Sequence, residues 1–371
     1  MVDLQGQYRN IQHQIDAKIK EVLASASFIN GDEVKDFQKE LASYLQVTHV
    51  IPCGNGTDAL QIAMMGLGLK PGDEVITVDF TFAATVEVIA LLGLKPVLVD
   101  VDPDTFTMDI QKLKEAITSK TKAIVPVHLF GQCANMEAIL KIAKEHHLYV
   151  IEDTAQAIGA DYIFTDGTQK KAGTMGVVGT TSFFPSKNLG AYGDGGALFT
   201  NDDDLAEKLR SIVNHGMSKR YYYDRIGVNS RLDNLQAAVL RIKLPLLDTY
   251  ADARQKAAAY YDNAFKNCDS IIIPKRSAVS THVFHQYTIK VKEEDRDGLH
   301  EYLKEHEVPN AIYYPVPLHQ QEAYKHFRFD LEKLQTTVEL CKTVLSLPMH
   351  TELDEEQLEY ISSKVLEFIK R

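Results

Sequence analysis

The stretch that decides the fold is residues 122–152, KAIVPVHLFGQCANMEAILKIAKEHHLYVIE. Residues 122–127 and 149–152 are short, mostly apolar and β-rich, which predicts two strands. Between them, residues 136–146 repeat apolar positions at three- and four-residue spacing, which predicts a helix. A strand, a helix and a second strand in this order form a βαβ unit, whose two strands run parallel in one sheet.

The same alternation extends in both directions along the chain. Further strands are expected at residues 49–52, 74–78, 95–100, 179–184 and 196–200, and helices at residues 58–66, 85–92 and 110–117. Several of these strands are apolar throughout, as expected when helices cover both faces of a sheet. The predicted fold class is therefore α/β, a mostly parallel sheet flanked by helices.

The two ends of the chain differ from this middle part. The first fifty residues have a helical pattern with a break at Asn30-Gly31. In the last third we expect a long helix over residues 243–258, a half-exposed strand over 285–291, and amphipathic helices over 296–307 and 354–370. We therefore expect N-terminal helices with a large α/β domain over residues 1–245, and a smaller α+β domain over residues 246–371.

Composition and charge exclude several classes of protein. The 371 residues include 40 Lys and Arg and 51 Asp and Glu, a net charge of −11, which argues against nucleic acid as a partner. The nearest two cysteines, Cys268 and Cys341, are 73 positions apart, so no CxxC pair or cysteine zinc knuckle exists. Residues 1–20 lack the apolar core of a signal peptide, and the apolar residues 88–99 are too short to span a membrane. We expect a cytoplasmic protein without a membrane partner.

The first segment with chemical content is Cys53-Gly-Asn-Gly-Thr-Asp-Ala-Leu60, which follows a strand and opens a helix. Small residues at a helix start present unpaired N–H groups and the positive end of the helix dipole, which suits a phosphate. The alternative is a tight turn in which Thr57 or Asp58 caps the helix. The segment is neither a Walker loop nor a GxGxxG motif, and alone it favours neither interpretation.

The second segment, Ile151-Glu-Asp-Thr-Ala-Gln156, places two acidic residues at the end of an apolar strand. Ligands of open parallel sheets gather at the carboxyl ends of the strands. A carboxylate there, such as Asp153, can hold a positively charged ring nitrogen. The alternative is a helix cap.

The third segment is residues 182–196, SFFPSKNLGAYGDGG, in which Lys187 follows an apolar strand and precedes four glycines. A lysine enclosed by closely approaching backbone can have a lowered pKa and form Schiff bases. Alone, a surface lysine on a flexible loop is the better interpretation.

Together the three segments favour one cofactor. Pyridoxal phosphate requires a helix terminus for its phosphate, a carboxylate for its pyridine nitrogen and a lysine for its aldehyde. These features occur here in that order, with Lys187 thirty-four residues after Asp153.

At this point the sequence closely resembles the DegT/DnrJ/StrS family of pyridoxal-phosphate-dependent nucleotide-sugar aminotransferases, over essentially the whole chain. The motifs that carry the resemblance are residues 56–60 (GTDAL), 79–85 (DFTFAAT), 127–131 (VHLFG), 152–156 (EDTAQ), 182–196 and 229–233 (NSRLD). The resemblance implies the aspartate-aminotransferase fold (fold type I) and a homodimer with active sites at the interface.

The resemblance also implies roles for single residues. Lys187 forms the Schiff base and moves the proton, Asp153 pairs with the pyridinium, Gln156 sits near the ring hydroxyl, and the ring of Phe82 stacks on the cofactor. The implied phosphate contacts are Gly56, Thr57, Asp58 and Ser182, with Asn229 donated by the other subunit. In the implied reaction, L-glutamate leaves pyridoxamine phosphate behind, which then aminates a nucleotide-linked keto-sugar. Some members with histidine in place of the lysine are dehydratases, so Lys187 favours transamination.

The identity of the sugar rests on local resemblance. Residues 215–233 resemble members that aminate UDP-2-acetamido-2-deoxy-3-oxo-D-glucuronate for surface polysaccharide or lipopolysaccharide. The carboxylate of a uronate needs a cation, and this segment contains Lys219, Arg220, Arg225 and Arg231. The alternative is that these side chains form ion pairs at a dimer interface. Arg231 is shared too widely in the family to select a uronate. Tyr313 and His319 belong to the family's Tyr-Pro-x-Pro-x-His segment near the substrate, or to a structural turn.

Several alternatives remain open. The substrate could be a dTDP-3-keto-6-deoxyhexose or a UDP-4-keto sugar. A regulatory protein that binds pyridoxal phosphate without turnover is argued against by the intact Lys187, Asp153 and Gln156. A cysteine desulfurase would need a histidine beside the lysine, where this chain has Ser186. His282 and His285 have no evident third ligand, so we expect no metal.

Overall fold

The computed structural model describes residues 1–370, and its centre is a seven-stranded sheet. In spatial order the strands are β1 (His49–Cys53), β9 (Gly196–Thr200), β8 (Val178–Ser182), β5 (Tyr149–Asp153), β4 (Thr121–Val125), β2 (Glu74–Val78) and β3 (Lys95–Val99). Only β9 runs antiparallel to its neighbours β1 and β8, whereas the other pairs are parallel. The predicted mostly parallel sheet is confirmed.

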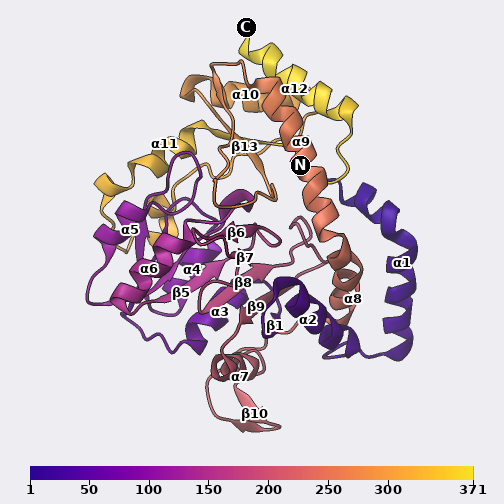
Figure 1. Cartoon of the computed structure of the whole chain (residues 1–371), viewed down its shortest axis with the longest axis vertical. Helices are drawn as coiled ribbons and strands as arrows, with labels where there is room; N and C mark the ends of the chain where they lie inside the picture. Colours follow the sequence, from indigo (N-terminus) through magenta and orange to yellow (C-terminus); the bar gives the residue numbers. More distant parts are fainter. Residues whose placement is uncertain (371) are drawn as a thin grey trace.

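Both faces of this sheet are covered by helices, which explains why several of its strands are apolar throughout. Neighbouring residues of one strand belong to different core clusters: Ile124 packs with α5 (Ile110–Ala116) and α6 (Met136–His146), and Val125 packs with α3 (Gly56–Gly66), α4 (Ala84–Leu91) and α7 (Asp203–Ile212). Successive side chains of a strand point to opposite faces, so the two clusters are the two layers beside the sheet. Figure 1 shows α5 and α6 together in the same part of the molecule.

Where the observed elements depart from the expected bounds, proline is one cause. The strand expected over residues 122–127 ends at Val125, before Pro126. The helix expected over residues 243–258 is replaced by a 3-10 turn, Leu244–Leu246, which contains Pro245, and by α9 (Leu247–Phe265). Proline lacks the backbone N–H that a strand ladder or helix interior requires. Two hairpins were not expected. The first pairs β6 (Asp161–Ile163) with β7 (Gln169–Lys171). The second pairs β10 (Met217–Lys219) with β11 (Tyr222–Tyr223), and this hairpin projects from the body in Figure 1.

The C-terminal part has a sheet and core of its own. The antiparallel strands are β12 (Ile271–Ile272), β13 (Tyr287–Val291) and β14 (Val344–Leu347); the helices are α10 (Glu293–Glu305), α11 (Gln335–Thr343) and α12 (Glu355–Ile369). Tyr261 and Phe265 of α9 lie in this core, whereas Leu247 of the same helix packs against the N-terminal helices. Because α9 contributes to both parts, the division at residue 246 stays a prediction.

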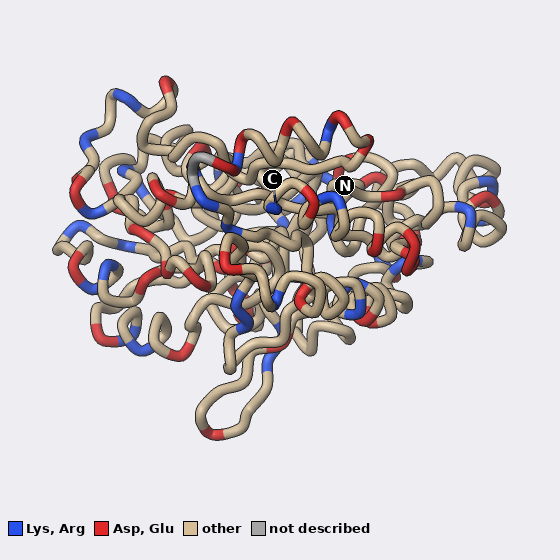
Figure 2. The backbone as a smooth tube through the Cα atoms, turned by 90° about the horizontal axis from the view of Figure 1, so that it is seen from above, with Lys and Arg blue, Asp and Glu red and all other residues tan. Residues whose placement is uncertain are grey.

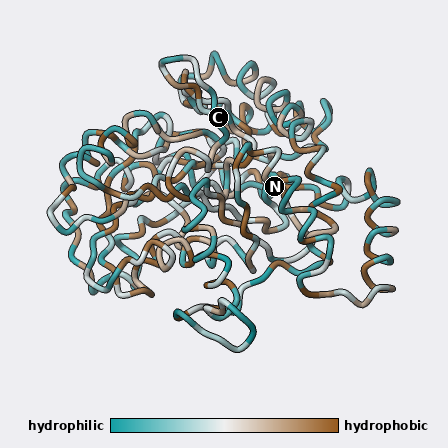
Figure 3. Tube along the Cα trace, turned by 60° about the horizontal axis from the view of Figure 1, so that its bottom comes forward, coloured by the Kyte–Doolittle hydropathy of each residue, from teal (hydrophilic) through white to brown (hydrophobic). Residues whose placement is uncertain are grey.

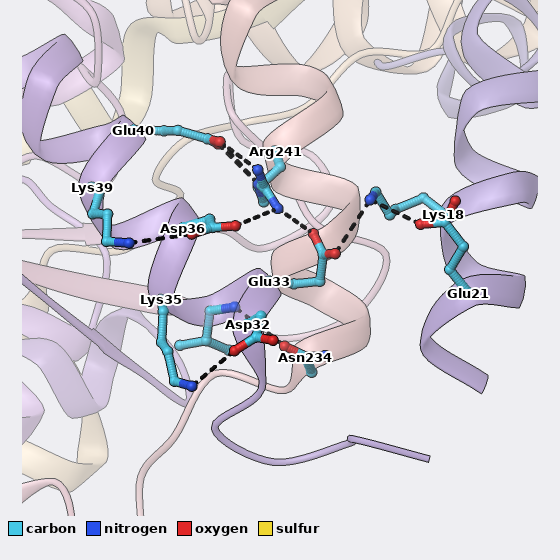
Figure 4. Close-up of polar contacts among 11 residues, drawn as sticks. Lys18, Glu21, Asp32, Glu33, Lys35, Asp36, Lys39, Glu40, Asn234 and Arg241 are labelled. Atoms are coloured by element: carbon cyan, nitrogen blue, oxygen red, sulfur yellow. Dashed lines mark hydrogen bonds and ion pairs between the residues drawn. The ribbon is translucent and has the colours of Figure 1, made fainter. Parts of the chain in front are cut away.

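The N-terminal helices are joined by charged side chains. Arg241 of α8 (Asn234–Lys243) contacts Glu33, Asp36 and Glu40 of α2 (Asp32–Leu45) at 2.8, 3.2 and 2.7 Å (Figure 4). Lys18 of α1 (Leu4–Ser25) reaches Glu33 at 3.3 Å. The network connects three helices, and α1 lies at the right edge of the molecule in Figures 1 and 3, where its Ile11 and Ile15 pack with Val239 of α8.

Charges of both signs are distributed over the outside of the molecule. Figure 2 shows Lys and Arg interspersed with Asp and Glu on most outer segments. Among residues 1–370, no helix combines the length and the apolar composition needed to cross a membrane.

Candidate active site

A cavity of about 600 Å³ lies at the carboxyl ends of β5 and β8 and the start of α3. Nine of the residues expected from the sequence line it: Gly56, Thr57, Asp58, Phe82, Asp153, Gln156, Ser182, Lys187 and Tyr313. Residues from the C-terminal part complete the wall, among them His285, Gln286 and Tyr314. The parallel sheet brings the segments together because its strands end at one edge.

The start of α3 forms one end of the cavity. Asn55 caps the helix by accepting a hydrogen bond from the backbone N of Asp58 at 2.8 Å. At Gly56 a Cβ atom would lie 2.6 Å from Cβ of Ser182, so only glycine allows the helix to approach β8 this closely. The positive end of the helix dipole therefore faces the cavity beside a serine hydroxyl, an arrangement that favours a phosphate.

The two adjacent acidic residues at the end of β5 have separate surroundings. Asp153 lines the cavity, and its carboxylate accepts hydrogen bonds from Oγ1 of Thr85 at 2.8 Å and from the backbone N of Ala155 at 3.1 Å. Glu152 is fully buried against His128, 2.9 Å from Nε2, and accepts from three backbone N–H groups. Successive strand residues point to opposite faces, so Asp153 alone is available to a ligand.

Gln156 is held in place between two parts of the chain. Its Oε1 accepts from the backbone N of Phe130 at 2.8 Å, and its Nε2 donates to the hydroxyl of Tyr314 at 3.2 Å. Burial raises the pKa of Tyr314, so this phenol stays neutral and keeps its proton.

Lys187 is the reactive amine of the cavity. It follows β8 in a turn closed by a 2.8 Å bond from its backbone N to O of Phe184. Burial lowers the pKa of Lys187 to about 8, although the charge of Asp153 opposes this shift. The side chain remains partly accessible because it faces the cavity.

The loop after Lys187 is tightly packed. At Gly190 a Cβ atom would lie 2.3 Å from the carbonyl oxygen of Pro185, and the buried Lys243 donates to the oxygen of Gly190 at 2.8 Å. This explains why glycine follows the reactive lysine so closely in the sequence.

Three residues expected at the site do not line this cavity. Asn229 is exposed, and Arg231 lines a separate hollow of about 250 Å³ with Lys35 and Arg210. His319 is buried, and its Nδ1 lies 2.5 Å from the carboxylate of Asp79 at the end of β2. The roles of these three residues stay predictions.

His285, Gln286 and Tyr314 line the cavity, and none of them was among the residues expected there from the sequence. Nδ1 of His285 donates to Oδ1 of Asn188 at 3.2 Å, and burial beside the cations of Lys187 and Arg254 holds the pKa of His285 well below the usual value. The available signals were the place of His285 at the start of an expected strand and, for Tyr314, its place as the tyrosine directly before Pro315 in the Tyr-Pro-x-Pro-x-His segment. Among the side chains that the structure describes, no group of three or more His, Cys, Asp or Glu residues could hold a metal ion.

The donor set fits pyridoxal phosphate. A helix start with a glycine that no larger residue could replace suits the phosphate, Asp153 suits a protonated ring nitrogen, and a lysine with a pKa of about 8 suits an aldehyde. All of these groups line one cavity.

Comparisons with known proteins agree with this chemistry. The sequence pattern of the DegT/DnrJ/EryC1/StrS aminotransferase family matches residues 9–366. The chain is 46% identical over 360 residues to UDP-2-acetamido-2-deoxy-3-oxo-D-glucuronate aminotransferase of Pseudomonas aeruginosa, covering 97% of each chain. It is 48% identical over 372 residues to a protein of Geobacillus stearothermophilus named pleiotropic regulatory protein, covering 100% of this chain and 98% of the other.

Solved structures show the same architecture. DesV of Streptomyces venezuelae, in complex with a ketimine intermediate, is 37% identical, with a TM-score of 0.95 over 100% of this chain and 98% of that chain. NtdA of Bacillus subtilis, with bound cofactor PMP, is 32% identical, with a TM-score of 0.88 over 98% of this chain and 82% of that chain. These structures confirm fold type I and the pyridoxal phosphate or pyridoxamine phosphate cofactor. The chain therefore belongs to the DegT/DnrJ/EryC1/StrS aminotransferase family and is a pyridoxal-phosphate-dependent sugar aminotransferase.

Proposed function

We propose that this aminotransferase moves the amino group of L-glutamate to C3 of UDP-2-acetamido-2-deoxy-3-oxo-D-glucuronate, in the cytoplasm, for a surface polysaccharide or lipopolysaccharide. The observation that carries the amino-transfer part is Lys187, which shares the cavity with Asp153 and has its pKa lowered to about 8. A pKa near neutrality lets one amine act as base and then as acid.

Each of the cavity's residues has its own role in the proposed reaction. Lys187 Nζ takes the proton from the α-carbon of the amino donor and later delivers a proton to the sugar carbon that receives nitrogen. When bound, the cofactor supplies an electron sink for the negative charge left on carbon. Asp153 would keep a proton on the ring nitrogen of the cofactor, and Gln156 and Phe82, which line the same cavity, would help to hold the ring.

The choice of a uronate rests on residues 215–233 and on the identity with the Pseudomonas aeruginosa relative. Lys219 and Arg220 lie on the exposed β10–β11 hairpin over the rings of Tyr222 and Tyr221, at 5.3 and 5.1 Å. Because neither lines the cavity of its own chain, we propose a homodimer in which a second copy supplies the cations, along with Asn229 and Arg231.

Two measurements test the reaction class. Purified protein should be yellow and should lose this colour with L-glutamate, with release of 2-oxoglutarate. The Lys187→Ala variant should release none, whereas Lys170→Ala, on the exposed part of β7, should behave as wild type. Glutamate turnover by Lys187→Ala would refute the role of this lysine.

The substrate is tested separately with a panel of keto-sugars. UDP-2-acetamido-2-deoxy-3-oxo-D-glucuronate should restore the yellow colour and yield a 3-amino product by mass spectrometry. If neutral dTDP-3-keto-6-deoxyhexoses or UDP-4-keto sugars react and the uronate does not, the substrate proposal is wrong.

A non-catalytic regulatory protein is the second candidate, because the relative from Geobacillus stearothermophilus is named a regulatory protein. This candidate predicts cofactor binding without loss of colour on adding glutamate. The intact Lys187, Asp153 and Gln156 in one cavity favour turnover.

A further inference from the structure

The phosphate end of the cavity contains an anion of its own. Asp58 is the third residue of α3, and it lines the cavity. A carboxylate in the first turn of a helix is attracted to the same positive helix end, and to the same N–H groups, that would bind a phosphate. Two anions thus compete for one helix terminus.

Only part of this terminus is available to a ligand. Asn55 accepts hydrogen bonds from the backbone N of Asp58 at 2.8 Å, through its side chain, and from the backbone N of Ala59 at 3.1 Å, through its carbonyl. Within residues 1–370, this leaves the N–H groups of Gly56 and Thr57 without a partner in the chain. These two donors are the ones that a misplaced carboxylate would take.

A buried serine from a distant part of the chain holds the carboxylate. Ser230 is 2% exposed, and its Oγ lies 2.6 Å from Oδ2 of Asp58, across 172 positions of sequence. The backbone N of Gly54 donates to the same Oγ at 2.8 Å. Because the N–H of Gly54 uses the hydroxyl as an acceptor and a carboxylate can only accept, the hydroxyl proton of Ser230 points to Asp58.

The serine is itself fixed. Its backbone N donates to the oxygen of Val213, just after α7, at 3.0 Å. A Cβ atom at Gly54 would lie 3.2 Å from both Oδ2 of Asp58 and Oγ of Ser230, so the pair fills the space beside this glycine. The carboxylate therefore has one well-defined position.

We propose that Ser230 is a positioning residue for the cofactor phosphate: it tethers the carboxylate of Asp58, so that the N–H groups of Gly56 and Thr57 stay open to the phosphate. The tether acts on the phosphate alone and contributes nothing to the ring or the aldehyde. The proposal rests on the cofactor site and not on the identity of the sugar, so the test needs neither sugar nor glutamate.

The test is titration of cofactor into protein from which it has been removed, with pyridoxal phosphate and with pyridoxal, which lacks the phosphate. Ser230→Ala should weaken pyridoxal phosphate binding by about tenfold to a hundredfold, the range for a hydrogen bond to a charged group, and leave pyridoxal binding unchanged. The double variant Ser230→Ala/Asp58→Asn should recover much of the loss, because the competing charge is gone. Ser211→Ala is a matched control, since the buried hydroxyl of Ser211 has no hydrogen-bond partner.

Unchanged affinity of Ser230→Ala for pyridoxal phosphate, or an equal loss for both ligands, would overturn the proposal, because a general structural role does not distinguish them. The single variant Asp58→Asn keeps the test decisive if Ser230→Ala does not fold. It should bind pyridoxal phosphate at least as tightly as wild type. Weaker binding would support the phosphate contact that the family resemblance implies for Asp58, and it would overturn the proposal.

Discussion

The charged amine of Lys187, which burial disfavours, should lower the free energy of unfolding of the cofactor-free protein. Its pKa falls from 10.5 in an exposed lysine to about 8, mainly because burial disfavours the charged form. One pKa unit corresponds to about 1.4 kcal/mol, so the charged amine costs up to about 3 kcal/mol at neutral pH. Lys187→Met removes the charge and keeps an unbranched side chain, so we expect it to stabilise the cofactor-free protein by up to this amount.

The stability that Lys187→Met gains over wild type must decrease as the pH rises. Between about pH 8 and pH 10.5 the unfolded chain holds the lysine proton and the folded chain does not, so wild-type stability rises with pH through this window. Below it both states are protonated and the full cost applies. The advantage of Lys187→Met should therefore be largest at pH 7 and fall below about 1 kcal/mol at pH 10.

The assay is urea unfolding, followed by circular dichroism at one protein concentration, at pH 7 and at pH 10. Other groups titrate in both proteins and cancel in the difference between them. Lys208→Met, at an exposed lysine of α7, is the control and should show no such pH dependence. If Lys187→Met is no more stable than wild type at pH 7, or if its advantage does not shrink at pH 10, the burial argument is wrong.

Three further changes test the neighbouring geometry. Asp153→Asn should lower the pKa of Lys187 below about 8, because the carboxylate charge raises it; the pH dependence of lysine acylation in the cofactor-free protein measures this, and a rise would contradict it. Gly56→Ala should weaken cofactor binding, because its Cβ would lie 2.6 Å from that of Ser182; unchanged binding in a cofactor titration would refute the close approach. Glu152→Gln should destabilise the protein by about 3 kcal/mol, because three backbone N–H groups lose a charged acceptor; an unchanged urea midpoint would argue otherwise.

The sequence by itself determines the elements whose signals are local. The apolar runs at residues 74–78 and 196–200 and the helical spacing at 136–146 predict β2, β9 and α6 with the observed bounds. The chemistry of the site is also visible locally, because a small-residue helix start, a strand-end carboxylate and a lysine before glycines each have a physical reason within a few residues. The order of these segments along the chain is enough to indicate pyridoxal phosphate.

Only the tertiary structure decides what depends on segments far apart in the chain. Periodicity assigns a strand to residues 196–200, but not the antiparallel direction of β9 within the sheet. The lowered pKa of Lys187 arises from the surrounding protein that excludes water, and the tether between Ser230 and Asp58 spans 172 positions. A sequence pattern records neighbours along the chain, whereas desolvation and hydrogen bonding depend on neighbours in space, which the packing of the whole chain sets.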